Sequence, residues 1–404
     1  MGPIQDERRG PSGTRVVGHA MHPPVLKPAR QQAEQASRAA TATRRSRLRF
    51  VPRVLLGAAI VATLLCGLAT GLARLGVALP AHAVSRSAWH GVLMIPAFFG
   101  AVISVERAVA VGRAWCFAAP VAAVLGGLLL LAGAPVALTQ AALLAGSVVL
   151  LVGSISVLRR QVALYLIALV IASACWSVGN LVWIVSGDPL AGVPGWLAFL
   201  VLTIVAERLE LMRMRPMRPV APYLFSGCVA LLLAGLILAI WQPGIGLRMF
   251  SASMLLMALW LAKYDIARYT VRQQGLTRFI AVALLSGYGW FAASGLLGLD
   301  GALAIGHPWH DAALHALTLG FVFSMVFGHA QIILPAVTRV RVKYSPLFYV
   351  PLVFLHAAVA VRVTGVLSGD FALRRFGSEA AAAALVTFIF VLLTAILSAR
   401  RSKR

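Results

Sequence analysis

The sequence predicts an all-α integral membrane protein with about twelve transmembrane helices in one bundle. Of its 404 residues, 60% are hydrophobic and only 12% are charged, and the mean hydropathy is +0.88. A soluble fold of this length could not bury so much apolar surface. The apolar residues also fall into runs of about twenty, the length that an α-helix needs to cross a bilayer.

Twelve such runs follow one another between short loops. They cover about 51–79, 87–111, 114–135, 137–158, 161–186, 190–212, 222–241, 247–268, 278–299, 311–335, 347–368 and 379–400. Residues 1–49 are polar, rich in Arg, Gln, Ser, Ala and Pro, and have no apolar periodicity. Such a segment cannot bury enough apolar surface to offset the entropy of ordering. We therefore predict a disordered basic cytoplasmic tail over residues 1–49 and a transmembrane domain over residues 50–404.

The positive charges predict the orientation of the spans. A net charge of +24 would suggest nucleic acid as the partner of a soluble protein, but here the basic residues lie in the tails and in alternate loops, so the expected environment is a lipid bilayer and no nucleic acid. Four of the remaining loops, at 132–139, 187–195, 242–246 and 299–307, carry neither Lys nor Arg. The positive-inside rule then places both termini in the cytoplasm, which requires an even number of spans, and predicts a multi-pass protein of the cell inner (plasma) membrane. Six arginines near the outer ends of spans are exceptions: Arg74, Arg86, Arg248, Arg362, Arg374 and Arg375.

Two histidines stand near the outer ends of spans that run in the same direction. His90 begins the second span and His315 lies in the first turns of the tenth, so the two imidazoles are at similar depth. Polar groups at membrane depth tend to be functional, and imidazole is the commonest metal ligand. We therefore take His90 and His315 as candidate ligands of a metal or haem. The alternative, a hydrogen bond to a neighbouring helix, is favoured for His82, His307 and His310.

A second pair is a candidate cofactor site in the other half of the bundle. His329 follows His315 by fourteen residues, which places it roughly 21 Å further along a helix and close to the same face. His356 lies near the middle of the eleventh span. Two histidines at this spacing are what a two-haem conduit needs, although no other helix repeats it: position 104, opposite His90, is Ser104.

Small residues recur every four positions along the tenth span, at Ala316, Gly320, Ser324 and Gly328. Such a ridge allows two helix backbones to approach closely in lipid. We expect the ridge to bring the helix of His315 against the helix of His90.

Other polar residues in the spans favour structural roles. Glu106 and Glu207 lie beside arginines near the cytoplasmic interface, where an ion pair is favoured over a proton path. Asn180 indicates an internal polar contact. The four cysteines stand singly in apolar runs, as buried core residues do. The sequence has no phosphate-binding loop, nucleophile elbow or dinucleotide fingerprint in a usable context.

The beginning of the tenth span, HALTLG at residues 315–320, resembles that of the NnrS-type membrane proteins. The likeness is firm over about 311–335, is supported by length and span number, and thins after Gly320, so it indicates a divergent member. The resemblance implies binding of haem and/or copper and a role in the nitric-oxide and nitrosative-stress response, with respiratory or denitrification proteins as candidate partners. His315 is the residue that it transfers directly, and His90 is transferred less directly.

The number of spans is also similar to that of the haem-copper oxidase and nitric oxide reductase large subunit. The His-x-His of that group is missing, because Ala313 and Leu317 flank His315, and Phe327 and Gln331 flank His329. Reduction of oxygen or nitric oxide of that type is therefore not expected.

Two other classes stay open at this stage. One is a proton-coupled secondary transporter without metal, in which histidines and glutamates relay protons. Paired broken helices and internal symmetry would favour it, and the sequence shows neither clearly. The other is an assembly partner of a respiratory complex. The sequence identifies neither the metal nor the substrate, and neither catalysis nor the oligomeric state.

The orientation can be tested with reporter fusions. A reporter that is active only in the periplasm should give signal when it is fused after Gly301 and none when it is fused after Arg341, because the charge rule places these positions on opposite sides. The reverse pattern would contradict the predicted positions of all the histidines.

Overall fold

The computed structural model describes residues 54–213 and 218–401, and this part of the chain is helical with no strand. Among the described residues, twelve helices are long and apolar enough to cross a membrane. The protein is therefore an all-α multi-pass membrane bundle, and the predicted fold class and number of spans are confirmed. The predicted tail, residues 1–49, lies outside the described residues.

Most of the spans begin and end within a few residues of the predicted positions. Eight spans are single helices: Val54–Ala73, α6 Val136–Leu158, α7 Leu164–Ser186, α8 Pro189–Met212, α9 Val220–Leu238, α10 Pro243–Tyr264, α12 Gly275–Leu299 and α16 Phe371–Arg401. Two spans consist of several helical segments: Ser87–Val111 is made of η1 Ser87–Trp89, α3 His90–Val92, η2 Leu93–Phe99 and α4 Gly100–Val111, and His310–Thr338 is made of α13 His310–His315, η4 Ala316–Val322 and α14 Phe323–Thr338. The other two begin with a short helix: η3 Ala114–Phe117 precedes α5 Ala118–Ala132, and η5 Pro346–Phe348 precedes α15 Tyr349–Leu367. Two short helices, α2 Ala81–Ser85 and α11 Ala267–Thr270, lie in loops. The first span ends earlier than predicted and the last begins earlier, at Phe371, so that it includes Arg374 and Arg375.

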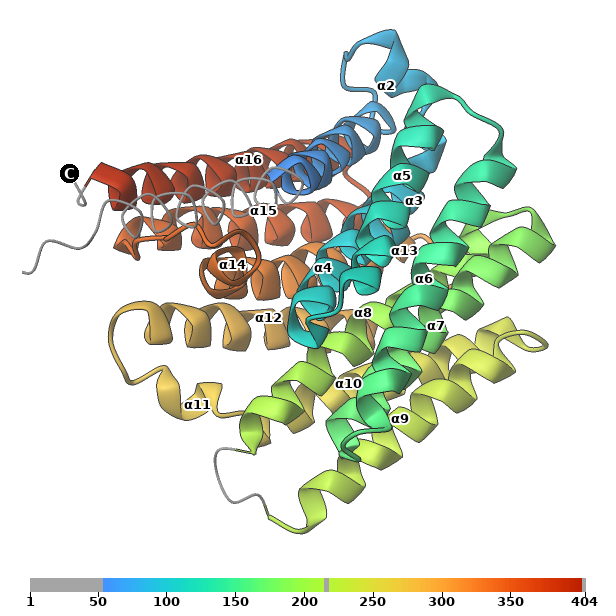
Figure 1. Ribbon diagram of the computed structural model, residues 1–404. Helices are drawn as coiled ribbons and strands as arrows, with labels where there is room; N and C mark the ends of the chain where they lie inside the picture. The colour runs from blue at the N-terminus through green and yellow to red at the C-terminus, as the bar shows by residue number, and fades with distance from the viewer. Residues whose placement is uncertain (1–53, 214–217, 402–404) are drawn as a thin grey trace, which may run out of the picture. The chain divides into compact units, whose positions relative to one another are not determined.

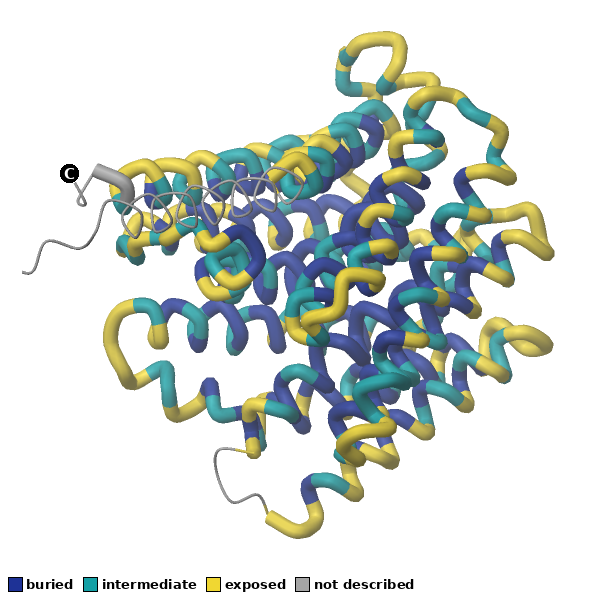
Figure 2. Tube along the Cα trace, in the orientation of Figure 1, coloured by how far each residue is buried: buried dark blue, intermediate teal, exposed yellow. Residues whose placement is uncertain are grey.

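Three spans form the centre of the bundle. The spans Ser87–Val111, Pro189–Met212 and His310–Thr338 are the most buried of the twelve, and the dark blue of Figure 2 follows these central helices while yellow marks the loops and the outward faces. α8 is apolar almost all round, which is typical of a helix that other helices enclose. In Figure 1 neighbouring helices pair along their length, as α15 does with α16 and α9 with α10.

Glycines allow α7 and α8 to pack closely. A Cβ added to Gly179 would lie 2.9 Å from the carbonyl oxygen of Gly192, so the two backbones touch as small residues permit. The predicted internal polar contact of Asn180 is confirmed beside them. Its side chain donates to the Leu143 carbonyl oxygen over 3.1 Å and accepts the indole N–H of Trp196 over 3.0 Å.

Two π-helical segments interrupt central spans, and each follows a candidate ligand. Leu93–Phe99 comes three residues after His90, and Ala316–Val322 comes directly after His315. Pro96 lies within the first of these segments, where its missing N–H removes an α-helical hydrogen bond. A π-helical turn holds more residues than an α-helical one, and such turns occur often at functional sites. Residues beyond the second segment, His329 among them, are therefore rotated from the face that an unbroken α-helix predicts.

The ridge of small residues packs against a different helix from the one predicted. A Cβ at Gly320 would collide with Trp290, and one at Gly328 would contact Ala283, both on α12. The expectation that this ridge meets the helix of His90 was wrong. The four-residue spacing shows that a helix approaches closely, but it does not show which helix, because the spacing carries no information on the partner.

We expect Gly179→Leu to lower the thermal stability of the protein, because the new side chain has no room between α7 and α8. Overpacking of this kind costs about 1–3 kcal/mol. The measurement is a thermal unfolding curve in detergent. Gly227→Leu on α9 is the matched control, since nothing lies within 4 Å of a Cβ added there. Equal melting temperatures for the two variants would contradict the close contact.

Candidate functional site

One cavity of about 430 Å³ contains both candidate ligands. We call it the histidine cavity. It is lined by the end of the first span, by α3 and η2, by the start of α8, by α13 and η4, and by α15 and α16. Its polar lining comes from Arg74, His90, His307, His310, Asp311, His315, Thr318, Arg362, Arg374 and Ser378. A cavity of this size with few polar groups is typical of a small-molecule site.

The structure brings the imidazoles of His90 and His315 together across this cavity. Their ring centres are 6.4 Å apart and their planes are inclined by 17°. The Nδ1 atom of His90 is 2.8 Å from the carbonyl oxygen of Gly67, and the Nδ1 atom of His315 is 2.8 Å from that of Asp311. A carbonyl oxygen can only accept, so Nδ1 carries a proton in both rings, and in a neutral ring the Nε2 atom keeps its lone pair. Among the described residues no hydrogen-bond partner is recorded for either Nε2.

A glycine on the first span positions the ring of His90. A Cβ added to Gly71 would lie 2.6 Å from Cε1 and 2.7 Å from Nδ1 of His90. The ring therefore lies directly on the backbone of the helix Val54–Ala73, where it reaches the Gly67 carbonyl oxygen. Any larger residue at position 71 would displace the ring.

A buried carboxylate positions His315. Asp311 lies one turn before it on α13, and its Oδ1 is 3.2 Å from the Nδ1 of His315. The same carboxylate accepts two hydrogen bonds from Arg362, at 3.0 and 2.7 Å, and pairs with Arg374 at 3.2 Å. A histidine that donates its second N–H to a carbonyl or carboxylate is held in one tautomer and orientation, which is the usual arrangement behind a metal ligand.

His90 and His315 can supply only two ligands, so they suit a metal that needs few protein ligands or a cofactor that supplies the remaining ligands itself. Within the part of the chain that the structure describes, no three His, Cys, Asp or Glu residues are grouped to hold an ion, so a tetrahedral all-protein zinc site does not fit. Because imidazole nitrogen binds a metal at about 2 Å, two imidazoles on opposite sides of one ion have ring centres roughly 6 Å apart. The observed 6.4 Å is compatible with His90 and His315 together holding one haem iron or one copper(I) ion with few ligands.

His307 and His310 also line the histidine cavity, which sequence reasoning did not foresee. Each has a partner close by in the chain, and none on a neighbouring span is recorded among the described residues. His307 accepts the backbone N–H of Trp309 over 3.1 Å, and the Nδ1 of His310 is 3.2 Å from the carbonyl oxygen of Ala302. The other candidate, His82, lies on the exposed helix α2.

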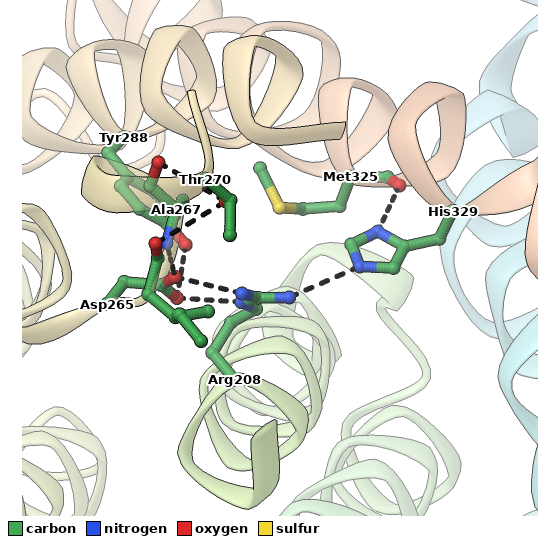
Figure 3. Close-up of polar contacts among 8 residues, drawn as sticks. Arg208, Asp265, Ala267, Thr270, Tyr288, Met325 and His329 are labelled. Atoms are coloured by element: carbon green, nitrogen blue, oxygen red, sulfur yellow. Dashed lines mark hydrogen bonds and ion pairs between the residues drawn. The ribbon is translucent and has the colours of Figure 1, made fainter. Parts of the chain in front are cut away.

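His329 belongs to a separate buried polar network (Figure 3). Its Nε2 faces the guanidinium of Arg208 at 3.4 Å, and its Nδ1 is 2.8 Å from the carbonyl oxygen of Met325. Arg208 donates two hydrogen bonds to Asp265, at 2.7 and 2.8 Å, and Tyr288 donates to the same carboxylate at 2.8 Å. The network ties α8 to the loop after α10, to α12 and to α14.

His356 has a different partner from His329. Its Nδ1 accepts the indole N–H of Trp290 over 2.9 Å. The structure records no contact between His356 and His329, and it gives each imidazole its own partner. Their assignment to a second cofactor site stays a prediction that no contact described here supports.

Two other polar predictions are confirmed. Arg107 pairs with Glu106 at 3.5 Å and with Glu207 at 3.3 Å, so these residues form the expected structural ion pairs. Cys66, Cys116, Cys175 and Cys228 are all free, and three of the four are buried.

Sequence reasoning missed the arginines and the aspartate of the cavity. A signal for them was present: Asp311 precedes His315 by four residues, and Arg362 and Arg374 are exceptions to the loop-charge pattern. That three charges on three helices meet at one point depends on tertiary packing, and spacing along the chain does not show it.

The described residues form a polytopic bundle with a cavity that imidazoles and arginines line, so the protein is a multi-pass membrane protein. The chain belongs to the family described as a domain of unknown function, DUF8744, which matches residues 53–397. No curated protein and no solved structure matches the chain.

The Arg208–Asp265 pair generates a stability prediction, because Asp265 is fully buried and the Arg208 side chain is 4% exposed. We expect Asp265→Leu to destabilise the protein by about 3–5 kcal/mol, since it leaves an unpaired buried charge. Adding Arg208→Met should recover much of that loss. Glu379→Gln is the control, because the Arg375–Glu379 pair is about 40% exposed and exposed pairs contribute about 0–1 kcal/mol. Thermal unfolding would refute the prediction if Asp265→Leu were as mild as the control.

Proposed function

We propose that this protein binds haem or copper between His90 and His315, and that it acts in the nitric-oxide or nitrosative-stress response of a bacterial inner membrane. The observation that carries the binding proposal is the facing pair of imidazoles, 6.4 Å apart, in one cavity. Both rings have Nδ1 held by a carbonyl oxygen and Nε2 left without a partner. When bound, copper with an open coordination position would supply affinity for a diatomic ligand such as nitric oxide, and haem held by both imidazoles would supply redox chemistry.

The orientation of the site follows from the loop charges. With both termini in the cytoplasm, the start of the second span and the start of the tenth lie at the outer face. The site is then reached from the side where exogenous nitric oxide arrives. The association with nitric oxide rests on the resemblance of residues 311–335 to the NnrS-type proteins, and His315 is the residue common to that resemblance and to the cavity.

The chain's own residues would have three tasks. His90 and His315 would hold the metal, Asp311 would fix the tautomer of His315, and the apolar walls contributed by Phe99, Leu319 and Phe323 would exclude water. Exclusion of water favours binding of a small apolar gas. The hydroxyls of Thr318 and Ser378 in the lining donate to backbone carbonyl oxygens, and we propose binding or sensing with no covalent step.

We expect His90→Ala and His315→Ala each to remove most of the bound metal while the protein remains inserted in the membrane. An absorption spectrum with analysis for iron and copper, recorded on purified protein, measures this loss. If the imidazoles were only hydrogen-bonded, the change would cost about 1 kcal/mol of stability and would leave the metal content unchanged. His82→Ala is the matched control, because His82 lies on an exposed helix outside the cavity.

The role in nitric-oxide resistance has its own readout. Cells that make the wild-type protein should resume growth sooner after a pulse of nitric oxide than cells that make His315→Ala at the same level. Equal recovery, together with normal metal binding by the wild type, would remove the nitric-oxide role and leave the metal site.

A further inference from the structure

The histidine cavity carries more positive charge than its own residues neutralise. Three arginines line it, Arg74, Arg362 and Arg374, and among the described lining residues Asp311 is the one acid. With neutral imidazoles, three positive charges against one negative charge leave a net charge of +2. Uncompensated charge near an apolar environment is costly, so a bound anion would stabilise this arrangement.

The single carboxylate is already shared among several donors. Asp311 accepts two hydrogen bonds from Arg362, pairs with Arg374 and contacts His315. Arg374 spends one terminal nitrogen on this pair, and its Nε atom is buried without a hydrogen-bond partner. Donors of Arg374 therefore remain for a further acceptor.

Arg74 stands at the exposed side of the same cavity. No side-chain hydrogen bond or ion pair is recorded for Arg74 among the described residues, and Arg74 is exposed. It comes from the helix Val54–Ala73 and the loop after it, whereas Arg374 comes from α16. Two guanidinium groups from different elements thus reach one cavity beside the imidazoles.

Close packing of α15 and α16 fixes the other two arginines. A Cβ added to Gly365 would collide with the backbone of Arg374, and one added to Gly377 would collide with the backbone of Arg362. Each arginine thus lies opposite a glycine of the other helix, and the two helices lie side by side in Figure 1. The arginines are held by rigid elements, as a preorganised binding site requires.

The arginines of this end of the bundle are also few. Six arginines depart from the loop-charge pattern, and three of them line this cavity. Of the others, Arg375 pairs with Glu379 on its own helix. Half of these exceptional charges thus meet in one cavity, where the guanidinium group recognises planar oxyanions through paired hydrogen bonds.

We propose that the histidine cavity binds an oxyanion at Arg74 and Arg374, next to His90 and His315. Two sources share this chemistry: the carboxylate side chains of a haem held by the two imidazoles, and a free small oxyanion such as nitrite. The first source rests on the proposed function, and the second does not need a metal.

The first arm of the test compares iron protoporphyrin IX with its dimethyl ester, which lacks the carboxylate charges. Binding is titrated by absorbance, with the full-length protein in lipid nanodiscs. The wild type should bind the free acid about tenfold more tightly than the ester, since hydrogen bonds to charged groups are the stronger ones. Arg74→Gln and Arg374→Gln should each reduce this preference, while Arg375→Gln, a change one position away and outside the cavity lining, should retain it.

The second arm measures nitrite binding to the metal-free protein by calorimetry. Binding that Arg74→Gln weakens and Arg375→Gln leaves unchanged would assign the site to a free oxyanion. Because no hydrogen bond or ion pair of the Arg74 side chain is recorded among the described residues, its variant should fold normally, and a thermal unfolding curve checks this.

The outcomes separate this inference from the proposed function. If neither porphyrin binds but nitrite binding requires Arg74, the haem proposal fails and the oxyanion site stands. If both porphyrins bind equally to wild type and arginine variants and nitrite does not bind, the oxyanion site is wrong and the haem site stands.

Discussion

The carboxylate of Asp311 is the contact on which the histidine cavity depends. It lies one turn before His315 and holds that imidazole in place. It also accepts hydrogen bonds from Arg362 on α15 and forms an ion pair with Arg374 on α16. Three spans are thereby fixed relative to one another at a single point. With the carboxylate absent, two guanidinium groups would face each other in a largely apolar cavity, which is the costly case for buried charge.

Glycines make this arrangement possible by allowing backbones to touch. Gly71 lets the ring of His90 lie on the first span, and Gly365 and Gly377 let α15 and α16 approach until each faces the backbone of an arginine. In lipid the hydrophobic effect contributes little to the association of helices, because the lipid tails are themselves apolar. Close backbone contact therefore supplies much of the packing energy. The glycine contacts therefore fix the positions of the helices, and the fixed helices in turn hold the charged side chains of the cavity in place.

The central spans carry different chemistry at their two ends. The span Ser87–Val111 places His90 in the histidine cavity and Arg107 in an ion pair with Glu106 and Glu207 at its other end. The span His310–Thr338 places His315 in the cavity and His329 beside Arg208. In the second network the carboxylate of Asp265 accepts hydrogen bonds from Arg208, from Tyr288 and from the backbone N–H of Ala267. In the histidine cavity, by contrast, the Nε atom of Arg374 is buried without a hydrogen-bond partner among the described residues.

The sequence by itself determined the environment, the number of spans and which histidines lie at similar depth, because hydropathy and loop charge are properties of single segments read in order. It also indicated the internal contact of Asn180 and the ion pairs of Arg107. Tertiary structure alone decided which helices touch. The ridge at Gly320 and Gly328 meets α12 and not the helix of His90, and π-helical turns rotate His329 toward Arg208. The contact of Asp311 with Arg362 and Arg374 could not be predicted from the sequence either. A partner more than fifty residues away produces no periodic pattern in either segment.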